Sequence, residues 1–426
     1  MINRAMLQRL MTAGSTWAIA DQMIASAGNF AISLLLARGL PPAEFGTFVL
    51  LNSVCLIVYG FHSNLIVSPL MVFGAPASAS KSQIYPTAAL AFTLALLPVS
   101  ALFVFSAAVS LHREIAGALA VLYALSWQLQ ETTRRALTCR FRYRDALWGD
   151  AISYLGQACI VGLLTLRPGT TLNTVFFTMA ATSLVAAALQ SWQAGLGLPT
   201  WTQLRECGTE FWTLGKWMVV VSITSAAASP VIPWMLNWFH GREAAASYQA
   251  ATNVLGLANP VILSIPAIVV PAAATFMAKS GAQTGKSLSR LAMKSMLKFE
   301  LIIAPWCAFV LLWPQTTLIW FYGKGSVYGS QTVALRIGVL VCILSVPMAV
   351  FGAALTGVGK TKSNAAMQGA GAVASLVCAP PLIFVGGVAG AMVADSVSRS
   401  VRAFVGIRAL GASPPEEAKI LGFVSE

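Results

Sequence analysis

Charged residues are scarce in this chain. Only 10% of its 426 residues are Asp, Glu, Lys or Arg, whereas a soluble domain carries about 25%. Hydrophobic residues make up 57% of the chain, above the roughly 45–50% that is usual for a soluble domain. This composition excludes an ordinary soluble globular protein and predicts that lipid is the main solvent of the chain.

Histidines and paired cysteines are also rare. The three histidines, His62, His112 and His240, have no metal-like spacing, and the seven cysteines stand singly without a Cys-x-x-Cys pair. Structural zinc sites and disulfide frameworks need closely spaced ligands or paired cysteines. We therefore predict no metal, no cofactor and no disulfide framework.

Long polar segments are missing as well. A membrane enzyme that polymerises or ligates glycans usually carries its catalytic residues in a large external loop, and every external gap predicted here is short. No Ser/His/Asp arrangement of the kind that hydrolases use can be read from the sequence. We predict that the protein is not an enzyme.

What the chain has instead is a series of about twelve apolar stretches, each near the roughly 20 residues that a helix needs to cross a bilayer. Backbone polar groups in lipid must be satisfied internally, so only helices and closed barrels span membranes. The alternating pattern of a barrel strand is absent. The sequence therefore predicts an all-α, polytopic membrane protein. The expected spans are 14–37, 47–73, 84–109, 115–136, 147–166, 172–196, 212–238, 247–277, 296–319, 331–356, 364–385 and 387–409.

Basic residues are distributed unevenly among the gaps between these stretches. Dense groups lie at 134–144 and 279–298. By the positive-inside rule, the gaps with dense basic groups face the cytoplasm, and both termini lie there too. The net charge of +13 then reflects topology and attraction to anionic headgroups, and we predict no nucleic-acid partner. The alternate gaps hold only Arg38, Arg113, Arg167, Arg242, Lys324 and Arg336.

Two short segments recur along the chain. Residues 136–144 (ALTCRFRYR) align without a gap with 354–362 (ALTGVGKTK), and the turn at 38–46 has a looser counterpart at 241–248. These matches pair the first span with the seventh and the fourth with the tenth, as two parallel six-helix repeats would. We predict an N-terminal lobe over 1–197, a cytoplasmic linker over 198–211, and a C-terminal lobe with a short cytoplasmic tail over 212–426.

The run LLLARGLPPAEFG at 34–46 resembles the turn after the first helix in polysaccharide flippases of the Wzx type. These flippases belong to the multidrug/oligosaccharidyl-lipid/polysaccharide (MOP) exporter superfamily, and their pattern at this turn is apolar-Ala-Arg-x-Leu-x-Pro-x-Glu-aromatic-Gly. The segment 135–144 is similar to the turn between the fourth and fifth helices of that family. The layout of twelve spans extends the resemblance over nearly the whole chain.

The resemblance implies a V-shaped, two-lobed transporter in a bacterial inner membrane. Its cargo would be an oligosaccharide linked to undecaprenyl diphosphate, moved from the cytoplasmic to the periplasmic leaflet by alternating access for exopolysaccharide or O-antigen lipopolysaccharide synthesis. Glycan hydroxyls and phosphates cannot cross hydrocarbon unaided. The implied partners are the lipid-linked oligosaccharide, membrane lipids, a polysaccharide polymerase and export machinery.

Ionisable residues inside membrane spans are rare and often functional, so the few present here are the candidate site residues. A diphosphate needs cations, and we predict a coupling role for Asp21 or Asp395. We predict that the substrate is bound by Lys216, Arg135, Arg134, Arg38 and Arg399.

Simpler interpretations of these residues stay open. The long side chains of Lys216 and the arginines can extend to lipid headgroups, Arg38 can pair with Glu44 across its turn, and Asp395 can form an ion pair with Arg399 four residues on. Asp21 has no charged partner within a turn of its own helix, so a functional role and a structural role are equally open for it.

Two other kinds of transporter stay open as well. A cation-coupled multidrug antiporter of the same superfamily would share the two lobes, although its cavity should favour carboxylates over Lys and Arg. A peptidoglycan-precursor flippase would share the carrier chemistry but typically has additional helices.

Overall fold

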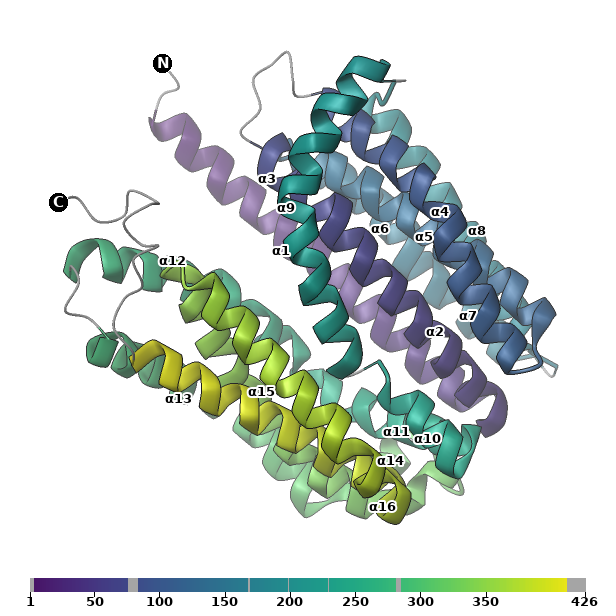
Figure 1. Cartoon of the computed structure of the whole chain (residues 1–426). Helices are drawn as coiled ribbons and strands as arrows, with labels where there is room; N and C mark the ends of the chain where they lie inside the picture. The colour runs from purple at the N-terminus through teal and green to yellow at the C-terminus, as the bar shows by residue number, and fades with distance from the viewer. Residues whose placement is uncertain are drawn as a thin grey trace. The chain divides into compact units, whose positions relative to one another are not determined.

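The computed structural model describes residues 4–75, 83–167, 169–197, 199–228, 230–280 and 285–411. Every regular element in these ranges is a helix, which confirms the all-α prediction. The chain folds into two compact units, Met1–Ser222 and Ile223–Glu426. Each unit is a bundle of long helices (Figure 1).

In the first unit, two of the long helices pass through a π-helical turn. Helix α2 continues through η1 into α3, and α6 continues through η2 into α7; single π turns inside helices are frequent at functional sites. The elements are α1 (Arg4–Gly39), α2 (Pro42–His62), η1 (Ser63–Val67), α3 (Ser68–Gly74), α4 (Ile84–Ser110), α5 (Glu114–Thr138), α6 (Tyr143–Asp150), η2 (Ala151–Gly156), α7 (Gln157–Thr165), α8 (Leu172–Ala194) and α9 (Trp201–Ala228).

Helix α5 is the centre of the first unit, because α2, α4, α6 and α8 all pack against it. Its neighbours shield it from lipid, so α5 can bury polar side chains that a lipid-facing helix could not tolerate. The polar composition of its C-terminal half follows from this position: Gln128, Gln130, Glu131, Thr132, Thr133 and Arg134 are all buried.

Helix α15 has the equivalent position in the second unit, where α11, α12, α13 and α16 pack against it. Helix α16 contains a sharp bend at Gly387, whose φ of 52° favours glycine. The Ser398 hydroxyl donates to the Gly371 carbonyl, so the two arms of α16 lie side by side. The elements are α10 (Ile232–His240), α11 (Arg242–Leu255), η3 (Gly256–Ala258), α12 (Asn259–Ser280), α13 (Gly285–Leu312), α14 (Pro314–Tyr322), η4 (Val327–Ser330), α15 (Thr332–Gly357) and α16 (Thr361–Gly411).

Nine helical segments within the described ranges are long and apolar enough to cross a membrane. The predicted spans 364–385 and 387–409 are the two arms of α16, which forms one of the nine. The predicted span 115–136 is α5, and 212–238 is divided between α9 and α10; these helices are not among the nine. All the predicted spans therefore fall on helices.

The turns after α5 and α15 have the same backbone hydrogen bonds at the positions that the sequence alignment pairs. Arg142 N–H donates to Leu137 O at 3.0 Å, and Lys360 N–H donates to Leu355 O at 2.9 Å. The residue at the tip is left-handed in both turns, with φ of 60° at Phe141 and 75° at Gly359. The two segments thus share a backbone conformation as well as a sequence pattern.

A basic side chain from each turn also binds a carbonyl near the end of another long helix in its unit. Arg140 donates to Ala194 O at the end of α8, and Lys360 donates to Ala409 O near the end of α16, both at 2.9 Å. A cation at a helix C-terminus stabilises the exposed carbonyls and the helix dipole. Burial lowers the pKa of Arg140 and of Lys360.

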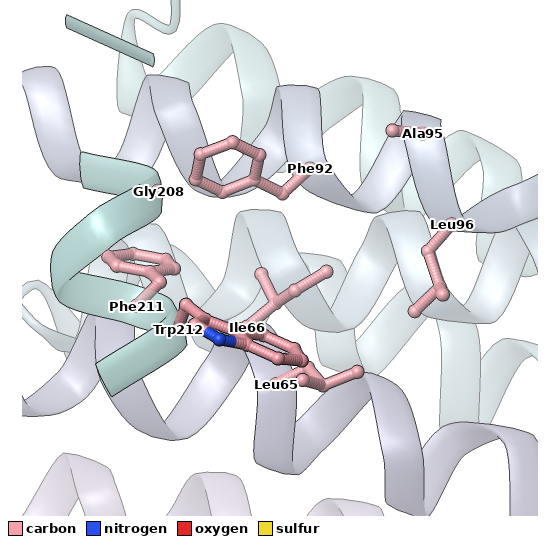
Figure 2. Close-up of a pocket in the computed structure, with 8 residues that line it drawn as sticks. All are labelled: Leu65, Ile66, Phe92, Ala95, Leu96, Gly208, Phe211 and Trp212. Carbon is pink, nitrogen blue, oxygen red and sulfur yellow. The ribbon is translucent and has the colours of Figure 1, made fainter. Parts of the chain in front are cut away.

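Helix α9 packs its first half against the first unit. Phe211 lies 6.3 Å from the ring of Tyr85 and 5.5 Å from that of Phe92, and Cys207 is buried in the same cluster. We predicted a linker over 198–211, and in the structure α9 begins at Trp201 within that stretch. Beside this aromatic cluster, α4, η1 and α9 surround an apolar cavity (Figure 2).

Candidate functional site

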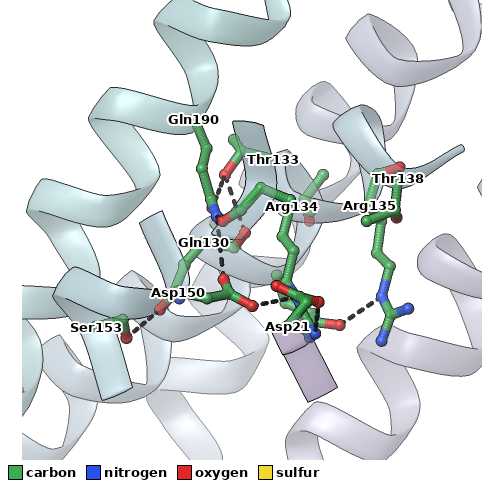
Figure 3. Close-up of polar contacts among 12 residues, drawn as sticks. Asp21, Gln130, Thr133, Arg134, Arg135, Thr138, Asp150, Ser153 and Gln190 are labelled. Carbon is green, nitrogen blue, oxygen red and sulfur yellow. Dashed lines mark hydrogen bonds and ion pairs between the residues drawn. The ribbon is translucent and has the colours of Figure 1, made fainter. Parts of the chain in front are cut away.

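The most distinctive feature of the first unit is a buried cluster of charges around Arg134 (Figure 3). Its guanidinium contacts three carboxylates: Asp21 at 2.5 Å, Asp150 at 2.6 Å and Glu131 at 3.2 Å. The side chains of these four residues are at most 7% exposed. A buried charge is costly unless it is paired and hydrogen-bonded, and the fork of an arginine can serve several carboxylates at once.

Three helices bring these groups together. Asp21 comes from α1, Glu131 and Arg134 lie one turn apart on α5, and Asp150 is the last residue of α6 before the π-helical turn η2. The cluster therefore joins the first helix of the unit to its centre, and any change in its charge acts on α1, α5 and α6 together.

Arg135 extends the cluster toward a more exposed region. Its Nε lies 2.6 Å from Glu131, and its side chain is 31% exposed whereas that of Glu131 is 2% exposed. Counted as ionised groups, the cluster contains the carboxylates of Asp21, Glu131 and Asp150 and the guanidiniums of Arg134 and Arg135. The carboxylates outnumber the cations by one.

Neutral polar groups hold the cluster from the side of α8. Gln190 donates to Asp150 Oδ1 at 3.1 Å and to Ala146 O at 2.9 Å, and it accepts from Thr133 at 3.3 Å. A side chain on Gly149 would overlap Gln190, so this glycine allows α8 to approach α6 closely. The Gln190 amide fixes the Asp150 carboxylate against Arg134.

A second, uncharged polar group lies on the opposite side of α5. His62, the last residue of α2, is buried with Nε2 at 2.9 Å from Thr132 and 3.1 Å from Thr93. The two threonine hydroxyls lie 2.7 Å apart. This group ties α2, α4 and α5 together at the start of the π-helical turn η1.

The second unit has a different charged group, on the last arm of α16. Asp395 accepts two hydrogen bonds from Arg399, at 3.0 and 3.1 Å, and Arg399 also donates to Ser345 of α15 at 2.7 Å. Arg402, one turn away, lies against Gly371 and donates to the sulfur of Met348 at 3.6 Å. The group thus contains two guanidiniums and one carboxylate, and the ion pair is between Arg399 and Asp395.

The predicted site residues therefore fall into distinct groups. Asp21, Arg134 and Arg135 meet in the first unit, and Asp395 and Arg399 form an ion pair four residues apart in the second. Their roles in binding and coupling stay predictions. The remaining two are exposed: Lys216 on α9 and Arg38 at the end of α1.

One expected pair is different in the structure. We considered that Glu44 pairs with Arg38 across the turn between α1 and α2, but the ion pair of Glu44 is with Arg113, at 2.6 Å. Arg113 precedes α5, so Glu44 joins the turn between α1 and α2 to the turn between α4 and α5. The local sequence could not show this contact, because the partners are 69 residues apart.

Sequence reasoning also missed two members of the Arg134 cluster. Glu131 could have been found from its spacing of three and four residues to Arg134 and Arg135, which places it on their face of a helix. Asp150 is an acidic residue inside the predicted span 147–166 and so met the same criterion as Asp21. Within the described ranges, no group of His, Cys, Asp and Glu has the geometry of a metal site.

Neither a protein-family model nor a curated protein matches the sequence. Solved structures do match over nearly the whole chain. An inward-facing multidrug resistance MATE family transporter of the MOP superfamily gives a TM-score of 0.75 at 15% identity, covering 97% of this chain and 100% of that one. Lipid II flippase MurJ in an inward closed conformation gives a TM-score of 0.67 at 12% identity, covering 95% and 89%.

A third solved structure is a MOP superfamily transporter from Pyrococcus furiosus, described as having a binding pocket of reverse polarity. It gives a TM-score of 0.61 at 13% identity and covers 95% of this chain and 96% of that one. At these identities the likeness is one of fold. The chain is a multi-pass membrane protein with the fold of MOP superfamily transporters.

Proposed function

We propose that the protein is an ion-coupled flippase that moves undecaprenyl-diphosphate-linked oligosaccharides across a bacterial inner membrane. It would work by alternating access, with both termini in the cytoplasm, and supply a polysaccharide polymerase on the other side. The substrate and the coupling ion would bind its conformations unequally, because a ligand shifts an equilibrium only by its differential affinity.

The observation that carries this proposal is the charge cluster of Asp21, Glu131, Arg134, Arg135 and Asp150. Buried charges in a membrane protein are expensive and usually functional. With one carboxylate in excess, the cluster becomes neutral when it takes up one proton or one monovalent cation. Asp21 is the best coupling residue, because its ion pair with Arg134 links α1 to the centre of the unit.

An anionic substrate is supported by different features. Arg399 pairs with Asp395 in the second unit and Arg402 follows one turn further along α16, and Lys216 and Arg38 are exposed cations near the ends or inside of predicted spans. Such groups suit a diphosphate. The turn at 34–46, which resembles that of polysaccharide flippases, supports a lipid-linked oligosaccharide over other anions.

A cation-coupled multidrug antiporter is the second candidate, and one observation favours it. The structure that gives a TM-score of 0.75 is a multidrug resistance MATE family transporter, compared with 0.67 for lipid II flippase MurJ. Buried carboxylates in the first unit would also suit the antiport of a cationic drug against a proton or sodium ion.

Reconstituted transport separates the two candidates. Purified protein in liposomes would be given a fluorescent undecaprenyl-diphosphate oligosaccharide, and its exchange between leaflets followed with a membrane-impermeant quencher. The flippase proposal predicts faster exchange than in protein-free vesicles. No acceleration, combined with uptake of an organic cation such as ethidium under an imposed ion gradient, would replace it with the antiporter.

A further inference from the structure

The cavity beside α9 lies entirely within the first unit and has an apolar lining. Its volume is about 290 Å³. The indole N–H of Trp212 is the single polar group among the lining side chains, and the rings of Phe92, Phe211 and Trp212 flank the space (Figure 2). The lining residues are Leu65, Ile66, Phe92, Ala95, Leu96, Gly208, Phe211 and Trp212.

Small residues keep this space open. Gly208 on α9 and Ala95 on α4 have no side chain long enough to fill it, and a Cβ at Gly208 would already lie 3.4 Å from Phe92. At Gly215 α9 comes so close to η1 that a Cβ would lie 3.3 Å from Leu65 O. The cavity is thus a groove between two packed contacts. It opens at the surface, where Ala95 and Trp212 are exposed.

The depth of the groove places it in hydrocarbon. Ile66 lies eight residues before the end of α3 at Gly74, and Phe92 lies eight residues after the start of α4 at Ile84. At 1.5 Å per residue, both are about 12 Å from the helix ends that we expect on the cytoplasmic side. An apolar groove at this depth is filled by a hydrocarbon chain rather than by water.

The charge next to the groove indicates what kind of lipid suits it best. Lys216 follows Trp212 by four residues and therefore lies on the same face of α9; it is exposed. An apolar groove beside a cation complements a lipid with a long tail and a strongly anionic head. A diphosphate carries more negative charge than the single phosphate of an ordinary phospholipid.

We propose that this groove between α4 and α9 holds part of the isoprenoid tail of the transported lipid while Lys216 contacts its diphosphate. The inference rests on the proposed function, because it takes undecaprenyl diphosphate as the lipid. It assigns a tail site to α4 and α9, which carry no residue of the charge cluster. The head can then move while the tail stays in hydrocarbon.

Photocrosslinking tests the assignment without requiring transport. The full chain in liposomes would be labelled with undecaprenyl diphosphate that carries a benzophenone on its tail, and the labelled peptides identified by mass spectrometry. We expect labelling in α4 and in the first half of α9. Unlabelled undecaprenyl diphosphate should compete, whereas the same concentration of phosphatidylglycerol should not.

Two variants fill the groove from opposite sides. Ala95→Trp from α4 and Gly208→Leu from α9 should each reduce specific labelling roughly tenfold, equivalent to about 1.4 kcal/mol of binding. The matched control is Leu102→Trp, an exposed position on the same side of α4 and about 10 Å further along the helix; its labelling should equal that of the wild type. If Ala95→Trp does not fold, the labelling of Gly208→Leu tests the proposal.

Several outcomes would overturn the proposal. Equal competition by phosphatidylglycerol would mean that an ordinary bilayer lipid occupies the groove, and undiminished labelling in both folded groove variants would place the tail elsewhere. Specific labelling without oligosaccharide exchange would have a different meaning: the tail site would stand, and the proposed flippase activity would fail.

Discussion

The two units carry buried ionic groups of opposite balance on equivalent scaffolds. Around α5, three carboxylates face two guanidiniums, whereas beside α15, Asp395 pairs with Arg399 and a second guanidinium, Arg402, follows one turn on. The turns after α5 and α15 nevertheless have matching hydrogen bonds. Similar frameworks thus hold an excess of carboxylates in one unit and an excess of guanidiniums in the other.

Each unit has a glycine that makes room for a long polar side chain. Gly149 makes room for Gln190 of α8 in the first unit, and Gly371 makes room for Arg402 of α16 in the second. Gly149 and Gln190 come from two helices, α6 and α8, whereas Gly371 and Arg402 come from the two arms of α16.

The largest effect should come from removing the cation at the centre of the first unit. Arg134→Met leaves Asp21, Glu131 and Asp150 buried without their main partner, so we expect a loss of about 3–5 kcal/mol in stability and no transport. Arg399→Met leaves only Asp395, with Arg402 nearby, and should cost less. Thermal unfolding of the purified variants measures both, with the exposed Arg142→Met as the control.

Equal losses in Arg134→Met and Arg399→Met would contradict the difference in balance between the two groups. A further check is the double variant Arg134→Met with Asp150→Asn. Because these residues are in contact, their effects should not add, and Asp150→Asn should restore part of the stability that Arg134→Met loses.

Neutralising one aspartate in each unit should have opposite consequences. Asp21→Asn balances the first cluster, so the protein should fold normally but lose the dependence of transport on an imposed pH or sodium gradient. Asp395→Asn leaves Arg399 without its carboxylate partner and should cost about 3 kcal/mol in stability. Unfolding curves and gradient-driven transport would be measured on both; gradient dependence retained in Asp21→Asn would rule out its coupling role.

We expect a smaller difference in stability between variants at the tips of the two paired turns. Gly359→Ala forces a side chain into a left-handed conformation, which should cost about 1–2 kcal/mol, whereas Phe141→Gly relieves that conformation and should change stability by less than about 1 kcal/mol. Gly369→Ala, at a helical position with open space around it, is the control and should cost nothing. A destabilising Phe141→Gly would mean that the exposed ring contributes more than the backbone strain costs.

The smallest effect is expected at Glu44 and Arg113. Both side chains are partly exposed, at 26% and 41%, and exposed ion pairs contribute about 0–1 kcal/mol. Glu44→Gln, Arg113→Gln and the double variant should therefore differ little in thermal stability at physiological salt. A coupling energy well above that range would show that this contact between the two turns is a structural anchor of the unit.

The sequence predicted the helices better than the site. Length and apolar composition are local properties, so the spans over 47–73 and 84–109 could be read directly. The partner of Asp21 could not, because Arg134 is 113 residues away and only the packing of α1 against α6 and η2 brings the two residues together. Glu131, by contrast, could have been placed beside Arg134 and Arg135 from the spacing of residues on a helix.

Some polar groups gave no readable signal at all. Thr93 and Thr132 are ordinary residues for a membrane helix, yet with His62 they form a buried hydrogen-bonded group. The predicted span 115–136 includes the polar second half of α5, which is tolerated in a membrane only because neighbouring helices surround it. Burial of this kind depends on the fold of the whole unit.

Transport of a fluorescent undecaprenyl-diphosphate oligosaccharide by the wild type and by Asp21→Asn, in the same proteoliposomes with and without an imposed ion gradient, tests the central claim most directly. We expect that the wild type exchanges the lipid between leaflets and that a pH or sodium gradient changes its rate, whereas Asp21→Asn is insensitive to the gradient. Identical gradient responses in both proteins, or no exchange by the wild type with its native glycan, would contradict this expectation.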